Sequence, residues 1–167
     1  TVTRFWGFAA PAYDTQVLQR FVYQPAQDEV LAQLRAHGAL TIADIGCGTG
    51  IFADRIEREL NAVVTGVDMS EGMLAQAKAR SSKVNWVTAP AEQLPFNDGA
   101  LDAVVTTSAF HWFDQPAALR ELFDAEEVPL QHAAEPSATY ISKPLNRLKV
   151  VNQLKITGKE NQPRIPD

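Results

Sequence analysis

The sequence predicts an α/β fold, a Rossmann-like parallel sheet with helices on both faces. Between residues 41 and 123, short apolar segments alternate with segments of helical periodicity. A glycine-rich loop, residues 46–50, joins the first apolar segment to the helix that follows it. Strands connected by crossover helices form a parallel sheet with right-handed connections. We therefore expect ligands at the carboxyl ends of the strands, where this loop lies.

Length and composition indicate one domain. The chain has 167 residues, is 46% hydrophobic and contains one cysteine, which excludes an intrachain disulfide and fits a reducing compartment. Its net charge of −5 argues against nucleic-acid binding, which depends on clustered Lys and Arg. No apolar run reaches the roughly 18 residues of a membrane span, and residues 1–6 lack the apolar core of a signal peptide. A cytoplasmic protein without nucleic-acid or membrane partners is expected.

Residues 1–40 are expected to form an N-terminal helical lid. An aromatic, poorly periodic start precedes a helix over residues 15–23. A second helix over residues 25–37 begins at a proline and ends before a glycine, as helices often do. The aromatic residues Trp6 and Tyr13 either close this lid over a ligand or simply pack against their neighbours.

Residues 41–123 are expected to form the ligand-binding core. Strands are predicted at residues 41–45, 62–67, 84–88 and 101–106, with helices at residues 50–60 and 70–80 and a further helix after Asp114. Ser70 and Asp114 have side chains that cap helix N-termini, and Pro116 fits the first turn of the last helix. The first of these strands carries an acid, Asp44, just before the glycine loop.

The spacing of the glycines in the loop can be compared with two known nucleotide-binding loops, that of the dinucleotide fold and the P-loop. A dinucleotide fold requires G-x-G-x-x-G/A, but Ile51 stands three positions after Gly48, and the third glycine is already Gly50. No Gly-Lys-Ser/Thr follows, so a P-loop is excluded. Asp68 ends the next strand, 22 positions after Gly46, where a carboxylate can accept hydrogen bonds from both ribose hydroxyls. The glycine spacing thus places a nicotinamide oxidoreductase a distant third among the interpretations of the chain.

Four ordered motifs give the chain a family resemblance. They are Asp44-Ile45-Gly46-Cys47-Gly48-Thr49-Gly50, Gly66-Val67-Asp68-Met69-Ser70, Ala91-Glu92-Gln93-Leu94-Pro95-Phe96, and Leu101-Asp102-Ala103-Val104-Val105 running into residues 109–114. In this order they resemble the class I S-adenosylmethionine-dependent methyltransferases, closest to the small-molecule, type 11-like branch. The resemblance covers about residues 40–123. It implies S-adenosylmethionine as cofactor and methyl transfer to a small-molecule acceptor by in-line displacement.

The resemblance also implies a set of cofactor-binding residues. The glycines of the loop would pass under the methionine part of the cofactor, with Asp44 near its amino group and Asp68 on the ribose hydroxyls. Met69 would lie against the adenine, with Ala91 and Glu92 at its edge. The full set is Asp44, Gly46, Cys47, Gly48, Gly50, Asp68, Met69, Ala91, Glu92 and Ser108.

Several of these residues also have a purely structural interpretation. Asp68 could be a turn residue at a strand end, and Asp44 could merely hydrogen-bond the glycine turn, although a buried carboxylate needs partners. Cys47 is most simply a small buried residue, because no positive charge beside it would activate a thiol. Glu92 could be a solvated acid of a loop.

His111 is the candidate catalytic residue. It follows the fourth strand at its carboxyl end, where it could act as a base if the acceptor must lose a proton. Alternatively, His111 and Trp112 only pack the pocket wall. His37 and His132 have no metal-like spacing to acids or to the cysteine, so no metal is predicted.

Residues 124–167 depart from the family pattern and leave a sheet that is incomplete relative to the seven-stranded methyltransferase fold. Weak strands are expected at residues 139–142, 148–151 and 154–157. Because the fourth strand would otherwise be an exposed edge, we expect this tail, packed or swapped, or a second subunit of a homodimer to cover it. The alternative function is that of a truncated relative that binds the cofactor or a partner protein without turnover.

Overall fold

The structure, a computed structural model, describes residues 23–97, 99–123, 138–141 and 149–152. Trp6, Tyr13, nearly all of the expected helix at 15–23 and the expected strand at 154–157 lie outside these residues. Within the described part of the chain, no helix combines the length and apolar character needed to cross a bilayer.

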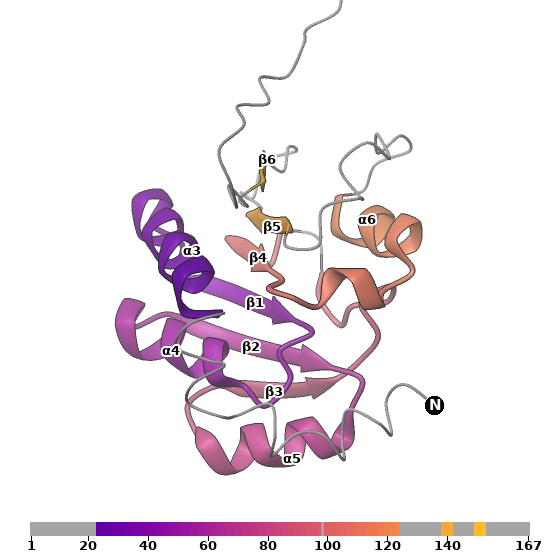
Figure 1. The fold of residues 1–167 in the computed structure, drawn as a ribbon, viewed down its shortest axis with the longest axis horizontal. Helices are drawn as coiled ribbons and strands as arrows, with labels where there is room; N and C mark the ends of the chain where they lie inside the picture. Colours follow the sequence, from indigo (N-terminus) through magenta and orange to yellow (C-terminus); the bar gives the residue numbers. More distant parts are fainter. Residues whose placement is uncertain (1–22, 98, 124–137, 142–148, 153–167) are drawn as a thin grey trace, which may run out of the picture.

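Four parallel strands form the central sheet in the order β3-β2-β1-β4 (Figure 1). They are β1 (Thr41–Ile45), β2 (Val63–Asp68), β3 (Asn85–Thr88) and β4 (Ala103–Val105). Asp44 stands beside Gly66 of β2 and Val105 of β4, so the carboxyl ends of these strands meet at one edge. The predicted Rossmann-like parallel sheet is confirmed in this partial form.

The helices follow the predicted alternation closely. They are α3 (Gln24–His37), α4 (Ile51–Leu60), α5 (Glu71–Arg80), η2 (Phe110–Trp112) and α6 (Gln115–Phe123). Gly38 ends α3 with φ 63°. The Ser70 hydroxyl accepts a hydrogen bond from the Met73 amide at 3.3 Å, and Asp114 Oδ1 accepts one from the Ala117 amide at 3.3 Å. Both predicted N-caps are therefore present.

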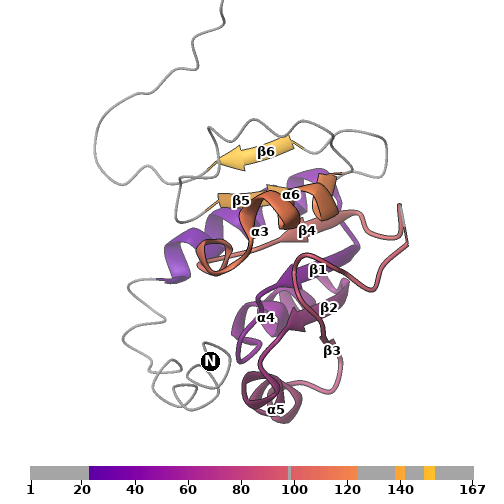
Figure 2. The ribbon, with the colours of Figure 1, turned by 90° about the vertical axis from the view of Figure 1, so that its right-hand side faces the viewer.

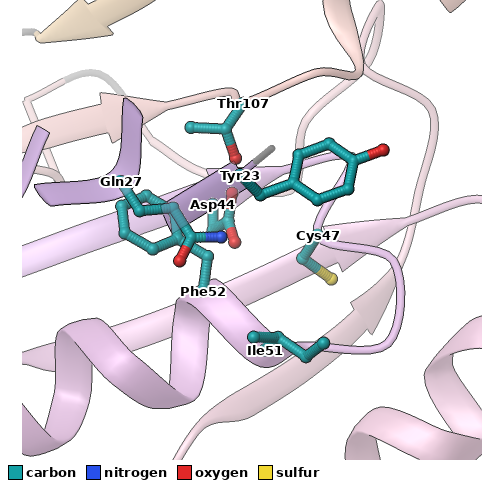
Figure 3. Close-up of a pocket in the computed structure, with 8 residues that line it drawn as sticks. Tyr23, Gln27, Asp44, Cys47, Ile51, Phe52 and Thr107 are labelled. Carbon is teal, nitrogen blue, oxygen red and sulfur yellow. The ribbon is translucent and has the colours of Figure 1, made fainter. Parts of the chain in front are cut away.

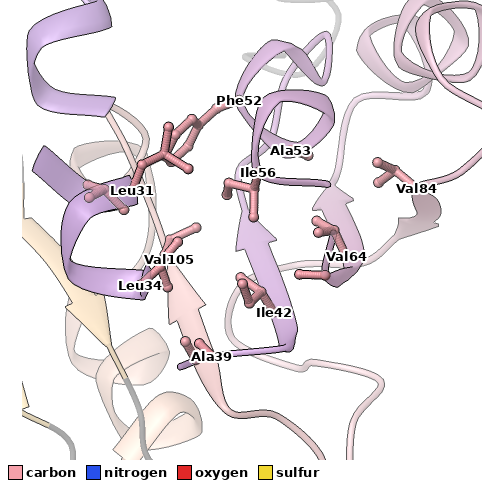
Figure 4. Packing of buried hydrophobic residues seen from close by; sticks show 13 residues of the cluster. Leu31, Leu34, Ala39, Ile42, Phe52, Ala53, Ile56, Val64, Val84 and Val105 are labelled. Atoms are coloured by element: carbon pink, nitrogen blue, oxygen red, sulfur yellow. The ribbon is translucent and has the colours of Figure 1, made fainter. Parts of the chain in front are cut away.

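Two hydrophobic layers enclose the sheet, one on each face. Figure 4 shows the layer in which α3 and α4 cover the sheet, with Leu34, Ile42 and Ile56 fully buried in it. Ala43 and Ile45 belong to the opposite layer, which α6 covers. Since strand side chains alternate between faces, Asp44 shares the face of Ile42 and lies under α3 and α4.

β4 begins later than the predicted strand at 101–106, because the side chain of Asp102 binds backbone amides just before the strand. Asp102 Oδ2 accepts hydrogen bonds from the amides of Leu40 and Thr41 at 3.0 and 2.9 Å, which tie the start of β4 to the start of β1. These bonds stabilise the charged form and hold the pKa of Asp102 below its usual value.

A separate antiparallel pair lies near the outer edge of the sheet. It consists of β5 (Ala138–Ile141) and β6 (Lys149–Asn152). β5 lies beside β4 in both views of the ribbon (Figures 1 and 2). The rest of residues 124–167 lies outside the described part, so the covering of β4 by the whole tail or by a second subunit stays a prediction.

Candidate functional site

The glycine loop leaves β1 and crosses the carboxyl end of β2. The amides of Gly46 and Cys47 donate hydrogen bonds to the Val67 carbonyl at 2.8 and 3.1 Å. Gly46, Gly48 and Gly50 have φ values of 72°, 55° and 77°, which glycine adopts without a steric penalty. The backbone path of the loop therefore explains the three alternate glycines.

Neighbouring side chains press against two of these glycines. A Cβ atom at Gly46 would overlap Ala109, and one at Gly50 would overlap the ring of Trp86. The same ring lies against Gly66 of β2. The sequence alone did not indicate this role of Trp86; the available signal was a strand glycine, Gly66, which often marks a close approach.

The end of α5 holds the loop from the other side. Arg80 Nε donates a hydrogen bond to the Thr49 carbonyl at 3.0 Å. Ser81 follows α5, and its carbonyl accepts a hydrogen bond from Trp86 Nε1 at 2.9 Å. These two bonds join the loop, α5 and β3 into one support. The sequence pattern did not reveal the bond to the loop, because Arg80 and Thr49 are 31 positions apart.

Asp68 is fixed between the loop and the start of α5. Its Oδ2 accepts a hydrogen bond from the Gly48 amide at 2.8 Å, and its Oδ1 accepts one from the Ser70 amide at 2.8 Å. Burial raises the pKa of Asp68, while these amide donors oppose the rise. The contacts agree with a turn role, and they also hold the carboxylate beside the glycine loop.

Asp44 is the other acid at this edge, and it is more deeply buried. Its exposed fraction is 1%, and its Oδ2 has no hydrogen-bond partner within the described part of the chain. Burial, and secondarily the charge of Asp68, raise the pKa of Asp44 from 3.8 to about 7. A buried polar atom without a partner is costly, so this oxygen indicates a place for a hydrogen-bonding or cationic ligand.

Asp44 faces an open pocket between the loop and α3 (Figure 3). The pocket is lined by Tyr23, Gln27, Asp44, Gly46, Cys47, Ile51, Phe52 and Thr107. Figure 3 shows the amide of Gln27 directed toward the carboxylate of Asp44. Asp68 is not among these lining residues, but it is bonded to the amide of Gly48, the residue that follows Cys47.

Cys47 lines the same pocket as a protonated thiol. It is 9% exposed, and its Sγ lies 3.9 Å from the Gly48 carbonyl oxygen. Burial, and after it the neighbouring acids Asp44 and Asp68, raise the pKa of Cys47 well above its usual value. A thiol held protonated is a poor nucleophile, which supports the interpretation of Cys47 as a small buried residue.

The residues predicted at the adenine follow the carboxyl ends of β2 and β3. Met69 is 54% exposed at the end of β2, whereas Ala91 is 4% exposed in the layer covered by α6. Glu92 is partly buried, and its Oε1 accepts a hydrogen bond from the Asp114 amide at 2.7 Å. Glu92 therefore joins the loop after β3 to the start of α6 rather than being a solvated loop acid.

The segment after β4 presents two exposed rings. Ser108 has a left-handed φ of 58°, uncommon outside glycine. Phe110 is fully buried and meets Phe113 edge to face at 5.9 Å, which anchors η2. His111 and Trp112, whose ring centroids are 4.8 Å apart, are exposed between them. Within the described residues, no carboxylate or carbonyl is bonded to the His111 ring.

Comparison with known proteins assigns this arrangement to a family. Residues 43–125 match the family described as "Methyltransferase domain". The chain belongs to the class I S-adenosylmethionine-dependent methyltransferases. This confirms the resemblance seen in the four sequence motifs.

Relatives of this methyltransferase include two bacterial proteins named malonyl-(acyl-carrier protein) O-methyltransferase. The one from Pectobacterium atrosepticum is 35% identical over 124 residues, which cover 73% of this chain and 47% of the relative. The one from Serratia marcescens is 36% identical over 117 residues, covering 69% and 44%. The chain therefore spans about half the length of the curated relatives it matches.

Solved structures show the same fold for this methyltransferase. Magnesium protoporphyrin IX methyltransferase from Synechocystis PCC 6803 with bound SAH has a TM-score of 0.60 at 25% identity, covering 74% of this chain and 65% of that one. A Methanococcus maripaludis protein described as a S-adenosyl-L-methionine-dependent methyltransferase has a TM-score of 0.59 at 21% identity, covering 70% and 57%. The cofactor of the family is S-adenosylmethionine. Its ammonium fits Asp44, whose buried Oδ2 has no hydrogen-bond partner among the described residues.

Proposed function

We propose that this chain binds S-adenosylmethionine along the glycine loop and transfers its methyl group to the carboxylate of an acyl acceptor. The observation that carries the binding site is the buried Oδ2 of Asp44, which lacks a partner in the described chain. The ammonium of the methionine end would supply that partner. Gly48 would let the loop backbone approach the ligand closely, because only Met73 Sδ, at 4.0 Å, lies near the position of its missing Cβ, whereas Gly46 and Gly50 would keep the path of the loop.

The remaining predicted residues would hold the nucleoside. Asp68 already lies beside Gly48 and would accept the ribose hydroxyls. The exposed side chain of Met69 offers an apolar surface for the adenine, with Ala91 at its edge. Glu92 would act mainly by holding its loop in place.

The acceptor is proposed from the names of the relatives. A malonyl group carries a free carboxylate, which is ionised at neutral pH because its ordinary pKa is near 4. Such an acceptor can attack a methyl sulfonium in line without losing a proton, so the protein contributes orientation more than acid–base chemistry. The exposed His111 would then border the acceptor with Trp112 and Ser108 rather than act as a base.

Methyl transfer from labelled S-adenosylmethionine tests this function. The acceptors are a malonyl thioester, free or on an acyl carrier protein, and the matched acetyl thioester, which lacks the carboxylate. We expect label to enter the malonyl compounds only. Label in a hydroxyl or amine acceptor instead would overturn the proposed acceptor class while retaining the cofactor.

His111→Ala separates the two acceptor classes further. A kcat that falls by a hundredfold or more, as loss of a general base typically causes, would indicate an acceptor that must lose a proton. Turnover close to that of the unmodified chain would favour the carboxylate acceptor.

A second candidate is a cofactor-binding relative without turnover. It is favoured by one observation, that the family match ends at residue 125 and leaves residues 126–167 outside it. Binding of S-adenosylhomocysteine by calorimetry, without transfer to any acceptor in the panel, would support this candidate.

A further inference from the structure

Asp44 occupies a position that a hydrophobic residue would normally fill. It lies on the face of β1 that α3 and α4 cover, with an exposed fraction of 1%. Its Oδ2 meets no hydrogen-bond donor in the described chain. We propose that Asp44 carries a proton in the cofactor-free chain and releases it to solvent when a ligand ammonium enters the pocket. This inference rests on the proposed cofactor site and adds a proton to its binding equilibrium.

The titratable neighbours of Asp44 on β2 and the loop favour its neutral form. Asp68, at the end of β2, is a second acid at the same edge of the sheet and repels a negative charge on Asp44. Cys47, in the loop, carries no positive charge and is itself held protonated. Burial, and after it the charge of Asp68, raise the pKa of Asp44 to about 7.

The helices over Asp44 do not supply a compensating cation. Gln27 of α3 and Tyr23, the residue before this helix, contribute an amide and a phenol, and neither group supplies a positive charge. Behind Gln27, among the described residues, lies Arg55 of α4, whose Nη1 is 3.5 Å from Gln27 Oε1. Arg55 is already paired with Asp28 and Glu59, so this group brings two negative charges for one positive charge.

The β4 side and the start of α4 are uncharged at the pocket. Thr107, just after β4, and Ile51 and Phe52, at the start of α4, complete the lining. A neutral carboxyl is therefore the form that this environment favours in the free chain.

An ammonium in the pocket reverses the preference. A positive charge within about 4–6 Å of a carboxyl favours its ionised form. The Asp44 carboxyl loses its proton to the buffer, its carboxylate pairs with the ligand ammonium, and the ligand keeps all of its own protons. One proton appears in solution for each ligand bound by the protonated form.

Calorimetric titration of the 167-residue chain with S-adenosylhomocysteine measures that proton. Titrations in two buffers of different ionisation enthalpy give the number of protons released. We expect nearly one proton at about pH 5.5 and about a quarter of one at about pH 7.5. Over the same range the Kd should decrease about twenty-five-fold, because the ionised form of Asp44 becomes populated.

5′-Methylthioadenosine is the matched ligand control. It keeps the adenosine and the thioether but lacks the amino-acid end, so it would contact Asp68 without placing an ammonium at Asp44. We expect its binding to release no proton. If both ligands release the same number of protons, the proton comes from elsewhere in the site, such as Asp68, and the inference is overturned.

Asp44→Asn is the matched variant, because the amide has the shape of the acid but does not titrate. Its binding of S-adenosylhomocysteine should be weaker and should release no proton. Proton release that persists in this variant would overturn the assignment to Asp44. Tight binding by the unmodified chain without proton release would overturn the inference but leave the proposed function intact, whereas no binding at any pH would overturn both.

Discussion

Replacing Asp44 by Asn should stabilise the cofactor-free chain, and the gain should grow as the pH rises. The folded pKa of Asp44 is raised from 3.8 to about 7. Between these two values the folded state keeps a proton that the unfolded state has lost, so rising pH costs stability. Below them both states are protonated, and above them the loss is complete. An asparagine at this position carries no such dependence.

The size of the effect follows from the shift. About three pKa units at 1.36 kcal/mol each correspond to about 4 kcal/mol of lost stability above pH 7. About 1.5 kcal/mol of this is already lost at about pH 5. The difference in unfolding free energy between the variant and the unmodified chain should therefore grow by about 2.5 kcal/mol from about pH 5 to about pH 8.

Urea denaturation followed by circular dichroism, without cofactor, measures this difference. Asp102→Asn is the matched control, because the pKa of Asp102 is lowered rather than raised. Its contribution to stability is present above its ordinary pKa and is lost only as the pH falls through the lowered value, so the control difference should stay constant from about pH 5 to about pH 8. A difference for Asp44→Asn that is also constant over this range would refute the reasoning.

Two further predictions concern the support of the loop. Gly46→Ala should destabilise the chain by about 3 kcal/mol or more, since it places a side chain at a left-handed φ and makes it overlap Ala109. The control Gly38→Ala has a similar φ but open space around it, so it should cost only about 1–2 kcal/mol. Equal losses of stability in thermal unfolding would contradict the role of the contact with Ala109. Trp86→Phe should cost about 1–2 kcal/mol, because it removes the hydrogen bond to Ser81 and part of the ring that fills the space beside the loop, as a shift in the urea midpoint would show.

The fold was predictable where its determinants are local in the sequence. The glycine loop, the caps at Ser70 and Asp114, and the helix end at Gly38 each depend on residues within a few positions of one another. Such signals set the order of the strands and helices. Together with the handedness of crossover connections, they lead to the parallel sheet.

The supports of the site were not predictable because their partners are far apart in the chain. The carboxylate of Glu92 meets the Asp114 amide 22 positions later, and Asp102 reaches the Leu40 amide across 62 positions. The contact of Trp86 with Gly66 depends on their being paired neighbours in the register of β2 and β3. No local pattern contains this information, although both acids were present in the recognised motifs.

A binding role and a structural role of Asp44 predict different changes in stability and in cofactor affinity when this residue is replaced. If Asp44 served to hold the glycine turn, its replacement would remove a needed hydrogen bond, and stability would fall. In the structure its Oδ2 satisfies no donor in the described residues, so replacement should instead raise the stability of the free chain and lower its affinity for the cofactor. Opposite changes in stability and affinity are typical of sites whose residues suit a ligand more than the fold. If the Asp44→Asn variant lost both stability and affinity, the main role of Asp44 would be to hold the glycine turn.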